Sequence, residues 1–412
     1  MNQRRIRTNL FFVTVSTGVR LGSMLGMYAM LSRALGPSEF GNFIYWYSIG
    51  VIASAVSDYG FGQQVLTRLP LADAEKLPQE ASRLAQAKLA LVTVIFLGVL
   101  AYAAGTTRAS TDILWIVPLV LGSASSSLFD FFAGMMRARG MYAGEMRWSL
   151  FASIGGNLGA GIAAILGGNL VIIASIFLIL RMGALLGQYL TWARPSGIVM
   201  QSFKFRRVVD VVSTMRGGTA FALDNLSTQL FASVDIIVAR YLLSAHDAGL
   251  YLAGNRLFQA AMVGVPIIAA VFTPRMVNDQ VNVKESTKTY RNLLALTGIA
   301  GVVLLLIFIQ GREVIVSILY GSQFSALPDL LPLFGIAVLV QFSAAAPGVR
   351  LSVMLQQRKR VLANFSAILV MVMALRVMGL CELARNSALS VCLILILGST
   401  AQAVAFGVLA KR

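Results

Sequence analysis

The chain has very little histidine and cysteine for its length. Its 412 residues include one histidine, His246, and two cysteines, Cys381 and Cys392. Structural zinc sites and disulfide frameworks need several of these residues at short spacings, and the three positions form no such pattern. We expect both cysteines to be small apolar residues packed in the last two helices. The sequence therefore predicts no metal site, no cofactor and no disulfide scaffold.

Charged residues are also scarce. They make up 12% of the chain, against about 25% in soluble domains, whereas 57% of the residues are hydrophobic. The mean hydropathy is +0.77, and the apolar residues come in long runs. A helix needs about 20 apolar residues to cross the hydrocarbon core of a bilayer. The first run contains Arg20, and we interpret it as a retained span instead of a cleaved signal peptide. The composition thus predicts an all-α, polytopic membrane protein.

Motifs for catalysis or nucleotide binding are absent from the sequence. It contains no P-loop, no nucleotide-binding domain and no DxD pair of the kind that glycosyltransferases use. We therefore expect a protein that is not an enzyme and does not use ATP bound by this chain. A pair of catalytic carboxylates is conceivable but has no supporting motif.

Apolar runs, separated by charged residues, glycine and proline, predict about twelve transmembrane helices. A shorter apolar stretch at 313–319 is expected to form an interfacial turn or short helix. The predicted spans cover residues 9–32, 41–66, 84–104, 112–136, 147–167, 170–192, 217–241, 248–272, 292–310, 328–349, 361–380 and 387–409.

The net charge of +17 would suit a nucleic-acid-binding protein, but the positions of the basic residues favour a membrane topology. With the N-terminus in the cytoplasm, 25 of the 34 Lys and Arg residues fall in cytoplasmic segments and five in outer loops. In this count Lys88 belongs to a cytoplasmic loop. The positive-inside rule then predicts that both termini lie in the cytoplasm.

A basic segment divides the predicted spans into two sets of six. We expect a first lobe over 1–192, a cytoplasmic linker over 193–216 and a second lobe over 217–412. The linker (SFKFRR at its centre) is interpreted as a basic amphipathic segment on the anionic inner leaflet, with a docking role for a partner as the alternative. Residues 31–47 and 238–254 resemble each other, which suggests parallel repeats of the kind found in transporters.

Four stretches carry a resemblance to a known family: SRALGPSEFGNFIYW, SDYGFGQQVLTR, VDIIVARYLLSAHDAGLYLAGNRLFQ and ILYGSQFSALPDLLPLFG. Together they resemble the polysaccharide-transporter (Wzx-like) flippases, which belong to a superfamily with multidrug exporters and the lipid II flippase. The resemblance implies a V-shaped bundle of two six-helix lobes with a central cavity. It also implies a substrate of oligosaccharide carried on a polyprenyl pyrophosphate.

Arginines inside the predicted spans are the candidates for substrate binding. A charge at the centre of a span costs about 2.5–3.5 kcal/mol on insertion scales, so it needs a partner, water or substrate. Arg20 and Arg181 lie midway along their spans, and Arg256 lies beside Asn255 with Gln259 one turn further on. The arginine fork suits a phosphate. For Arg20 and Arg181 the alternative is a structural ion pair with an aspartate of a neighbouring helix, such as Asp58. Arg256, Asn255 and Gln259 are interpreted as a polar lining.

Four aspartates inside or near the spans are the candidates for ion coupling: Asp58, Asp130, Asp224 and Asp235. Such carboxylates bind a coupling cation or proton in many transporters, and they equally form ion pairs between helices. Asp224 and Asp235 are eleven residues apart and are expected on one stripe of a single helix with Thr228 and Phe231.

These observations lead to one main hypothesis. We expect a flippase for a lipid-linked oligosaccharide (O-antigen, capsule or exopolysaccharide repeat unit) in a bacterial inner membrane. Its partners would be membrane lipids, a coupling cation (proton or sodium) and a polysaccharide polymerase or ligase, with no nucleic acid. An ion-coupled drug or small-molecule exporter of the same fold and a membrane-embedded polymerase or transferase remain as alternatives.

Overall fold

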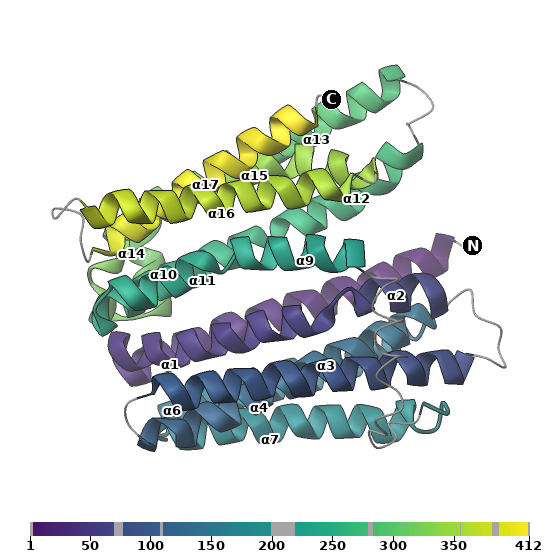
Figure 1. Cartoon of the computed structure of the whole chain (residues 1–412), viewed down its shortest axis with the longest axis horizontal. Helices are drawn as coiled ribbons and strands as arrows, with labels where there is room; N and C mark the ends of the chain where they lie inside the picture. The colour runs from purple at the N-terminus through teal and green to yellow at the C-terminus, as the bar shows by residue number, and fades with distance from the viewer. Residues whose placement is uncertain are drawn as a thin grey trace. The chain divides into compact units, whose positions relative to one another are not determined.

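The structure is a computed structural model that describes residues 3–69, 77–107, 110–198, 219–278, 283–354, 356–380 and 387–410. Over these residues the chain is helical and contains no strand (Figure 1). Cys381, Arg385 and most of the predicted linker, residues 199–216, lie outside the described residues. The all-α fold predicted from composition is confirmed.

The chain forms two compact units, and its path passes between them more than once. The first unit contains Met1–Ala34 and Trp46–Leu226, and the second contains Leu35–Tyr45 and Ser227–Arg412. A short piece of the first long helix therefore belongs to the second unit. The predicted division at the linker remains a prediction, because the linker is mostly outside the described residues.

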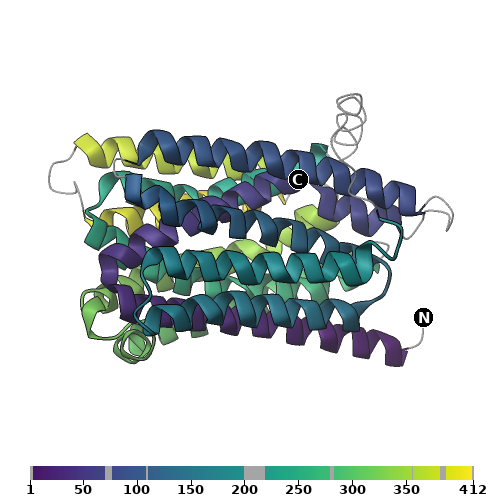
Figure 2. The same cartoon turned by 90° about the horizontal axis from the view of Figure 1, so that it is seen from below.

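The first unit is a bundle built around α4 and α7, which pack along each other (Figure 2). Helix α3 and the short α2 pack on α4, and α6 packs on α7. Two π-helical turns, Ile154–Leu158 and Tyr189–Ala193, interrupt or extend the α-helices. The α-helices that lie wholly or largely in this unit are α1 (Gln3–Asp58), α2 (Phe61–Arg68), α3 (Leu77–Thr106), α4 (Ser110–Ala138), α5 (Tyr142–Ser153), α6 (Gly159–Ile165) and α7 (Leu170–Gln188).

The second unit is arranged around α15, which packs against α13, α17 and α11. Helix α16 packs along α17. The α-helices here are α9 (Thr219–Phe231, which begins in the first unit), α10 (Val234–Leu242), α11 (Ala245–Met262), α12 (Gly264–Asn278), α13 (Val283–Gln310), α14 (Arg312–Leu319), α15 (Leu327–Val353), α16 (Gln357–Leu380) and α17 (Ala388–Leu409).

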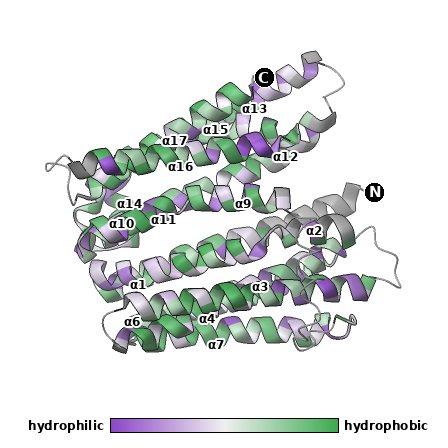
Figure 3. Cartoon of the chain, viewed as in Figure 1, coloured by the Kyte–Doolittle hydropathy of each residue, from purple (hydrophilic) through white to green (hydrophobic). Residues whose placement is uncertain are grey.

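The predicted spans agree closely with the helices. Among the described residues, nine helical segments are long and apolar enough to cross a membrane. Three predicted spans remain. Spans 9–32 and 41–66 lie on either side of a break at Gly36 in α1, and the second of them continues into α2. The described part of span 217–241 covers α9 and α10. Figure 3 shows apolar residues over the middle of most helices. The predicted short helix after the ninth span is α14, which has eight residues.

Several expected details are wrong. Lys88 does not lie in a loop: it is eleven residues inside α3 and has 1% of its surface exposed. The stripe from Asp224 to Asp235 does not lie on one helix, because the chain leaves the helix at Ala232 and Ser233 and restarts as α10. Predicted span eight still matches one apolar segment, Ala245–Thr273. Its helix is interrupted at Val263, three residues before Pro266, whose missing N–H removes a helical hydrogen bond.

One close backbone contact connects the two resembling stretches of the sequence. Within the second unit, Gly41 packs on Gly249, and a Cβ built on Gly41 would lie 2.8 Å from the Cα of Gly249. The same region holds Phe40 against the rings of Tyr320 and Phe324, at centroid distances of 6.1 and 5.8 Å. The segment Leu35–Tyr45 is thus a packed part of the second unit.

Candidate functional site

A cluster of polar side chains from several helices lies in the first unit. We call it the unit 1 polar cluster and define it by Arg20, Ser23, Asp130, Asn157 and Arg181. These residues come from α1, α4, the π turn after α5, and α7. The sequence predicts Arg20 and Arg181 as substrate-binding residues and Asp130 as an ion-coupling residue, and the structure brings all three into this one unit.

Arg20 pairs with Asp130. Its Nη2 donates to Oδ1 of the aspartate at 2.7 Å, and the two side chains are 46% and 49% exposed. The partner is therefore an aspartate of a neighbouring helix, but it is Asp130 and not Asp58. A half-exposed ion pair inside membrane-spanning helices is stable next to water or a polar ligand and costly next to lipid tails. The pair thus marks a polar face of the first unit.

Arg181 is bound differently. Its Nη2 donates to Oδ1 of Asn157 at 2.7 Å, and its guanidinium carbon lies 5.2 Å from the centre of the Phe177 ring. The Asn157 amide in turn donates to the Ser23 hydroxyl at 3.0 Å. No carboxylate among the described residues forms an ion pair with Arg181, and its buried Nε has no hydrogen-bond partner there. Arg181 therefore adds a positive charge that Asp130 does not neutralise.

The π turn explains how Asn157 reaches its partners. The extra residue of a π turn changes the direction of the side chains within a helix, and such turns are frequent at functional sites. Ile154–Leu158 carries Asn157 with 2% exposure. Gly156 in the same turn supports the arginine: a Cβ built there would lie 2.7 Å from the Nε of Arg181. No sequence periodicity identifies Asn157, because the π turn shifts its position.

A second ion pair in the first unit includes Lys88, which the sequence predicts as a loop residue. Lys88 Nζ lies 3.4 Å from Oδ1 of Asp58. The lysine side chain is 1% exposed and the aspartate 32% exposed. Asp58, a predicted ion-coupling residue, is thus paired with the buried ammonium group of Lys88 on α3. A search for charges inside long helices would have found Lys88 once the start of α3 was known.

In the second unit, Asp235 lies at the centre of a buried group. Its Oδ2 accepts a hydrogen bond from the Tyr251 hydroxyl and another from the Asn255 amide, both at 2.6 Å. Asp235 is 1% exposed, and its Oδ1 has no partner among the described residues. No Lys or Arg of the described chain lies within ion-pair distance of it. A buried carboxylate without an ion pair depends on hydrogen bonds such as these, on protonation or on a bound cation.

Arg256 and Gln259 contact each other instead of lining an open surface. The Nη1 of Arg256 donates to Oε1 of Gln259 at 2.8 Å, and Arg256 is 3% exposed. Asn255, which the sequence places on the same face as Gln259, is turned to Asp235. Of the predicted substrate-binding arginines, Arg20 alone is more than a third exposed in this structure. Asp224 lies on α9 and Asp235 on α10, so these two predicted ion-coupling residues belong to different helices.

A network of neutral side chains connects four helices of the second unit. The Asn364 amide donates to the Ser227 hydroxyl at 2.9 Å, and the Gln402 amide donates to Oδ1 of Asn364 at 2.7 Å. Gln341 donates to Gln402 at 3.0 Å. These amides satisfy one another inside an apolar bundle, so we assign them a structural role. Groups of three or more His, Cys, Asp or Glu that could hold a metal ion are absent from the part of the chain that the structure describes.

Comparison with solved structures identifies the fold. An inward-facing multidrug resistance MATE family transporter of the MOP superfamily superposes with a TM-score of 0.74 at 15% identity, covering 98% of this chain and 97% of that chain. The lipid II flippase MurJ, in an inward closed conformation, gives 0.74 at 12% identity, covering 98% and 88%. A MOP superfamily transporter from Pyrococcus furiosus Vc1 gives 0.62 at 14% identity, covering 99% and 94%.

Comparison with protein families identifies the relatives by sequence. No curated protein matches the chain. The family model described as "Polysaccharide biosynthesis protein" matches residues 6–280, which is more than half of the chain. The chain is a multi-pass membrane protein that has the fold of MOP superfamily transporters and belongs to the polysaccharide biosynthesis protein family.

Proposed function

We propose that this protein is a flippase for a polyprenyl-pyrophosphate-linked oligosaccharide, such as an O-antigen, capsule or exopolysaccharide repeat unit. It would act by alternating access in a bacterial inner membrane, with both termini in the cytoplasm. The family is one of polysaccharide biosynthesis, and a fold neighbour is named as a flippase for lipid II, itself a lipid-linked substrate. Catalysis plays no part in this proposal.

The observation that carries the proposal is the excess positive charge of the unit 1 polar cluster. Arg181 lies twelve residues into the 24-residue span Leu170–Ala193, roughly 17 Å from either end, where the charge cannot reach the headgroups. Its charge has no carboxylate partner among the described residues. An anionic substrate would supply that partner during transport.

Pyrophosphate fits the donors of this cluster. A guanidinium binds phosphate oxygens through two parallel N–H donors and stays charged when water is removed. Arg20, with a half-exposed side chain, would add a second cation when the substrate competes with Asp130. The polyprenyl chain would stay in the bilayer. The unit 1 polar cluster would therefore bind the pyrophosphate of the substrate. Contacts between the sugars and residues outside this cluster would determine specificity.

The energy source would be an ion gradient coupled through the second unit. Asp235, with Tyr251 and Asn255, would take up a proton or sodium ion on the free Oδ1. Asp58 is already paired with Lys88, so we give it a secondary place in coupling. Arg256 is buried and donates to Gln259, so it would not contact substrate in this conformation.

The ion-coupled exporter of the same fold is the second candidate. A buried acid such as Asp235 would serve a coupling ion whichever substrate is carried. An exporter of organic cations, however, would have no use for an unneutralised Arg181. A membrane-embedded polymerase or transferase is the third candidate function. The three candidates predict different results in a strain that lacks this protein.

The test starts from a strain lacking this protein. We expect a polyprenyl-pyrophosphate oligosaccharide to accumulate on the cytoplasmic side and to be cleared by restoring the protein. Accumulation on the outer side would support a polymerase or transferase instead. Absence of accumulation would support the exporter and would contradict the flippase.

Variants of Arg181 connect this phenotype to the site. Loss of one charge-assisted phosphate contact, worth about 1.5–3 kcal/mol, lowers binding roughly tenfold to a hundredfold. Arg181→Ala should therefore fail to clear the trapped lipid, and Arg181→Lys should clear it partly because the charge remains. Arg147→Ala, an exposed arginine on α5, is the matched control and should clear it fully. Full clearance by Arg181→Ala at equal abundance would remove Arg181 from the mechanism.

A further inference from the structure

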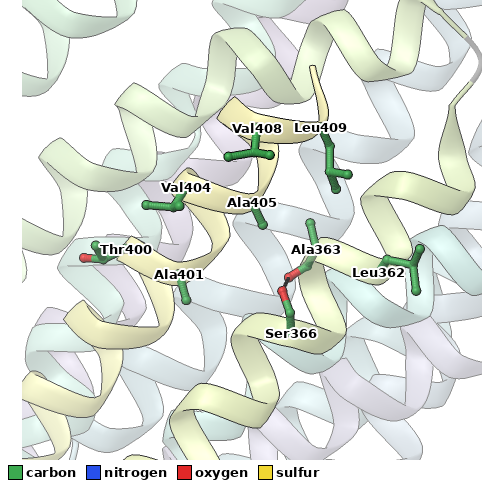
Figure 4. Close-up of a pocket in the computed structure, with 9 residues that line it drawn as sticks. All are labelled: Leu362, Ala363, Ser366, Thr400, Ala401, Val404, Ala405, Val408 and Leu409. Atoms are coloured by element: carbon green, nitrogen blue, oxygen red, sulfur yellow. Dashed lines mark hydrogen bonds between the residues drawn. The ribbon is translucent and has the colours of Figure 1, made fainter. Parts of the chain in front are cut away.

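A shallow groove runs between α16 and α17 in the second unit (Figure 4). It encloses about 590 Å³, within the range of small-ligand sites. The groove is lined by Leu362, Ala363 and Ser366 of α16 and by Thr400, Ala401, Val404, Ala405, Val408 and Leu409 of α17.

The lining is apolar in effect, although it includes two hydroxyl side chains. Ser366 donates to the Ala363 carbonyl at 2.8 Å, and Thr400 donates to the Ile396 carbonyl at 2.8 Å. Both hydroxyls are thus satisfied within their own helices. Alanines 363, 401 and 405 create the hollow, because their short side chains leave space between the larger ones on either side.

Large apolar side chains at the groove are left uncovered by the rest of the chain. Leu362 is 65% exposed, Val404 60% and Val408 52%. On α17 the lining runs from Thr400 to Leu409, which at 1.5 Å per residue is roughly 14 Å. That length is close to half of the ~30 Å hydrocarbon core, so the groove matches one leaflet.

One end of the groove is basic. Arg358 lies one helical turn before Leu362, is exposed, and pairs with no other described residue. Lys359 reaches across to the end of α17, where its Nζ lies 3.5 Å from the carbonyl oxygen of Leu409, a lining residue. Arg360 donates to the Ser352 hydroxyl at 2.6 Å. Three successive cations therefore stand where the apolar groove reaches the end of the helices.

We infer that this groove is a binding site for an anionic phospholipid of the leaflet at that end. One acyl chain lies along α17 from Leu409 toward Thr400, and the phosphate lies at Arg358 and Lys359. Basic pockets between transmembrane helices recognise anionic headgroups in this way. The site does not depend on the proposed transport function, because neither the unit 1 polar cluster nor Asp235 takes part in it.

Native mass spectrometry of the full-length protein in detergent tests the inference. The probe is an equimolar mixture of phosphatidylglycerol and phosphatidylcholine with identical acyl chains. We expect the protein to retain phosphatidylglycerol preferentially. A basic residue near the surface contributes about fivefold to anionic-lipid affinity, so Arg358→Gln should lower the preference roughly fivefold. Ala405→Trp, which fills the groove, should lower retention of both lipids.

Two variants of the same unit serve as controls. Arg291→Gln removes an exposed charge from α13, and Val302→Trp enlarges a half-exposed side chain on the same helix. Both should behave as the parent protein. Val408→Trp narrows the groove at an already exposed position and repeats the test if Ala405→Trp yields no folded protein. Equal retention of the two lipids by the parent, or an equal effect of Arg291→Gln and Arg358→Gln, would overturn the inference.

Discussion

Lys88 has almost no exposed surface, and its single charged partner among the described residues, Asp58, is partly open to solvent. Taking an ammonium group out of water is costly unless a counter-charge stays close. The pair therefore stabilises α3 against the end of α1 mainly by avoiding an isolated buried cation. Removal of Asp58 should destabilise the protein more than removal of both residues, because it leaves the buried charge of Lys88 behind.

We expect Asp58→Asn to lower the free energy of unfolding by about 1–3 kcal/mol, since it leaves Lys88 without a counter-charge. The double variant Asp58→Asn with Lys88→Met should be closer to the parent protein, because no buried charge remains. Thermal unfolding in detergent measures both. A double variant less stable than Asp58→Asn alone would contradict a charge-based explanation.

At the residue scale, the sequence reveals charges but not their partners. Arg20 and Arg181 are visible because each interrupts a long apolar run. Their partners Asp130 and Asn157 are 110 and 24 residues away along the chain, and no local pattern connects such positions. Lys88 is missed because it falls near the start of the predicted span 84–104, where it is counted with the cytoplasmic loop that precedes the span. Helix α3 in fact begins at Leu77.

At the element scale, the π turn Ile154–Leu158 is the piece of secondary structure that shapes the unit 1 polar cluster. It turns Asn157 toward Ser23 and Arg181, and it places Gly156 against the guanidinium. Its neighbour Gly155 has open space where a Cβ would be. Two adjacent glycines thus differ in what a methyl group would touch.

This difference gives a matched pair of variants. Under the proposed flippase function, Gly156→Ala should displace the Arg181 guanidinium and lower transport of the lipid-linked oligosaccharide roughly tenfold or more, since small misplacements of a binding group are costly. Gly155→Ala should leave transport unchanged. Clearance of the trapped lipid in the deletion strain, at equal protein abundance, compares them. Equal activity of the two variants would show that the position of Arg181 is unimportant.

Helix positions are largely predictable from the sequence, whereas breaks within them are not. The predicted spans 112–136 and 170–192 differ from α4 and the helix ending at Ala193 by two residues or fewer at each end, because hydropathy alone marks these helices. The break at Ala232–Ser233 has no glycine or proline to announce it. It moves Asp235 off the stripe shared with Asp224 and into its bonds with Tyr251 and Asn255.

At the scale of the whole molecule, each unit holds an ionisable side chain that has no ion-pair partner among the described residues, a base in the first unit and an acid in the second. The base is Arg181 and the acid is Asp235. A substrate anion and a coupling cation would each complete one unit. Binding sites for substrate and ion in separate units allow each to influence the conformational equilibrium of the molecule.

The coupling proposal predicts a specific defect for Asp235→Asn. The amide keeps the size of the side chain but cannot take up a proton or balance a cation. Transport in proteoliposomes should then persist at a low rate that no longer responds to a proton or sodium gradient. The exposed Asp329→Asn at the start of α15 is the control and should keep the response. A gradient-dependent Asp235→Asn protein would exclude this acid from coupling.

The segment Leu35–Tyr45 has a consequence for the design of chimeric proteins. It is joined to the N-terminal half of the chain but packs in the second unit, where Gly41 lies on Gly249 and Phe40 lies between aromatic rings. A C-terminal half produced alone would lack this piece and expose the surface that it covers. If homologues exchanged halves at the central linker, residues 35–45 of one protein would have to pack on the second unit of the other. Functional chimeras would therefore require residues 35–45 to be exchanged together with the C-terminal half.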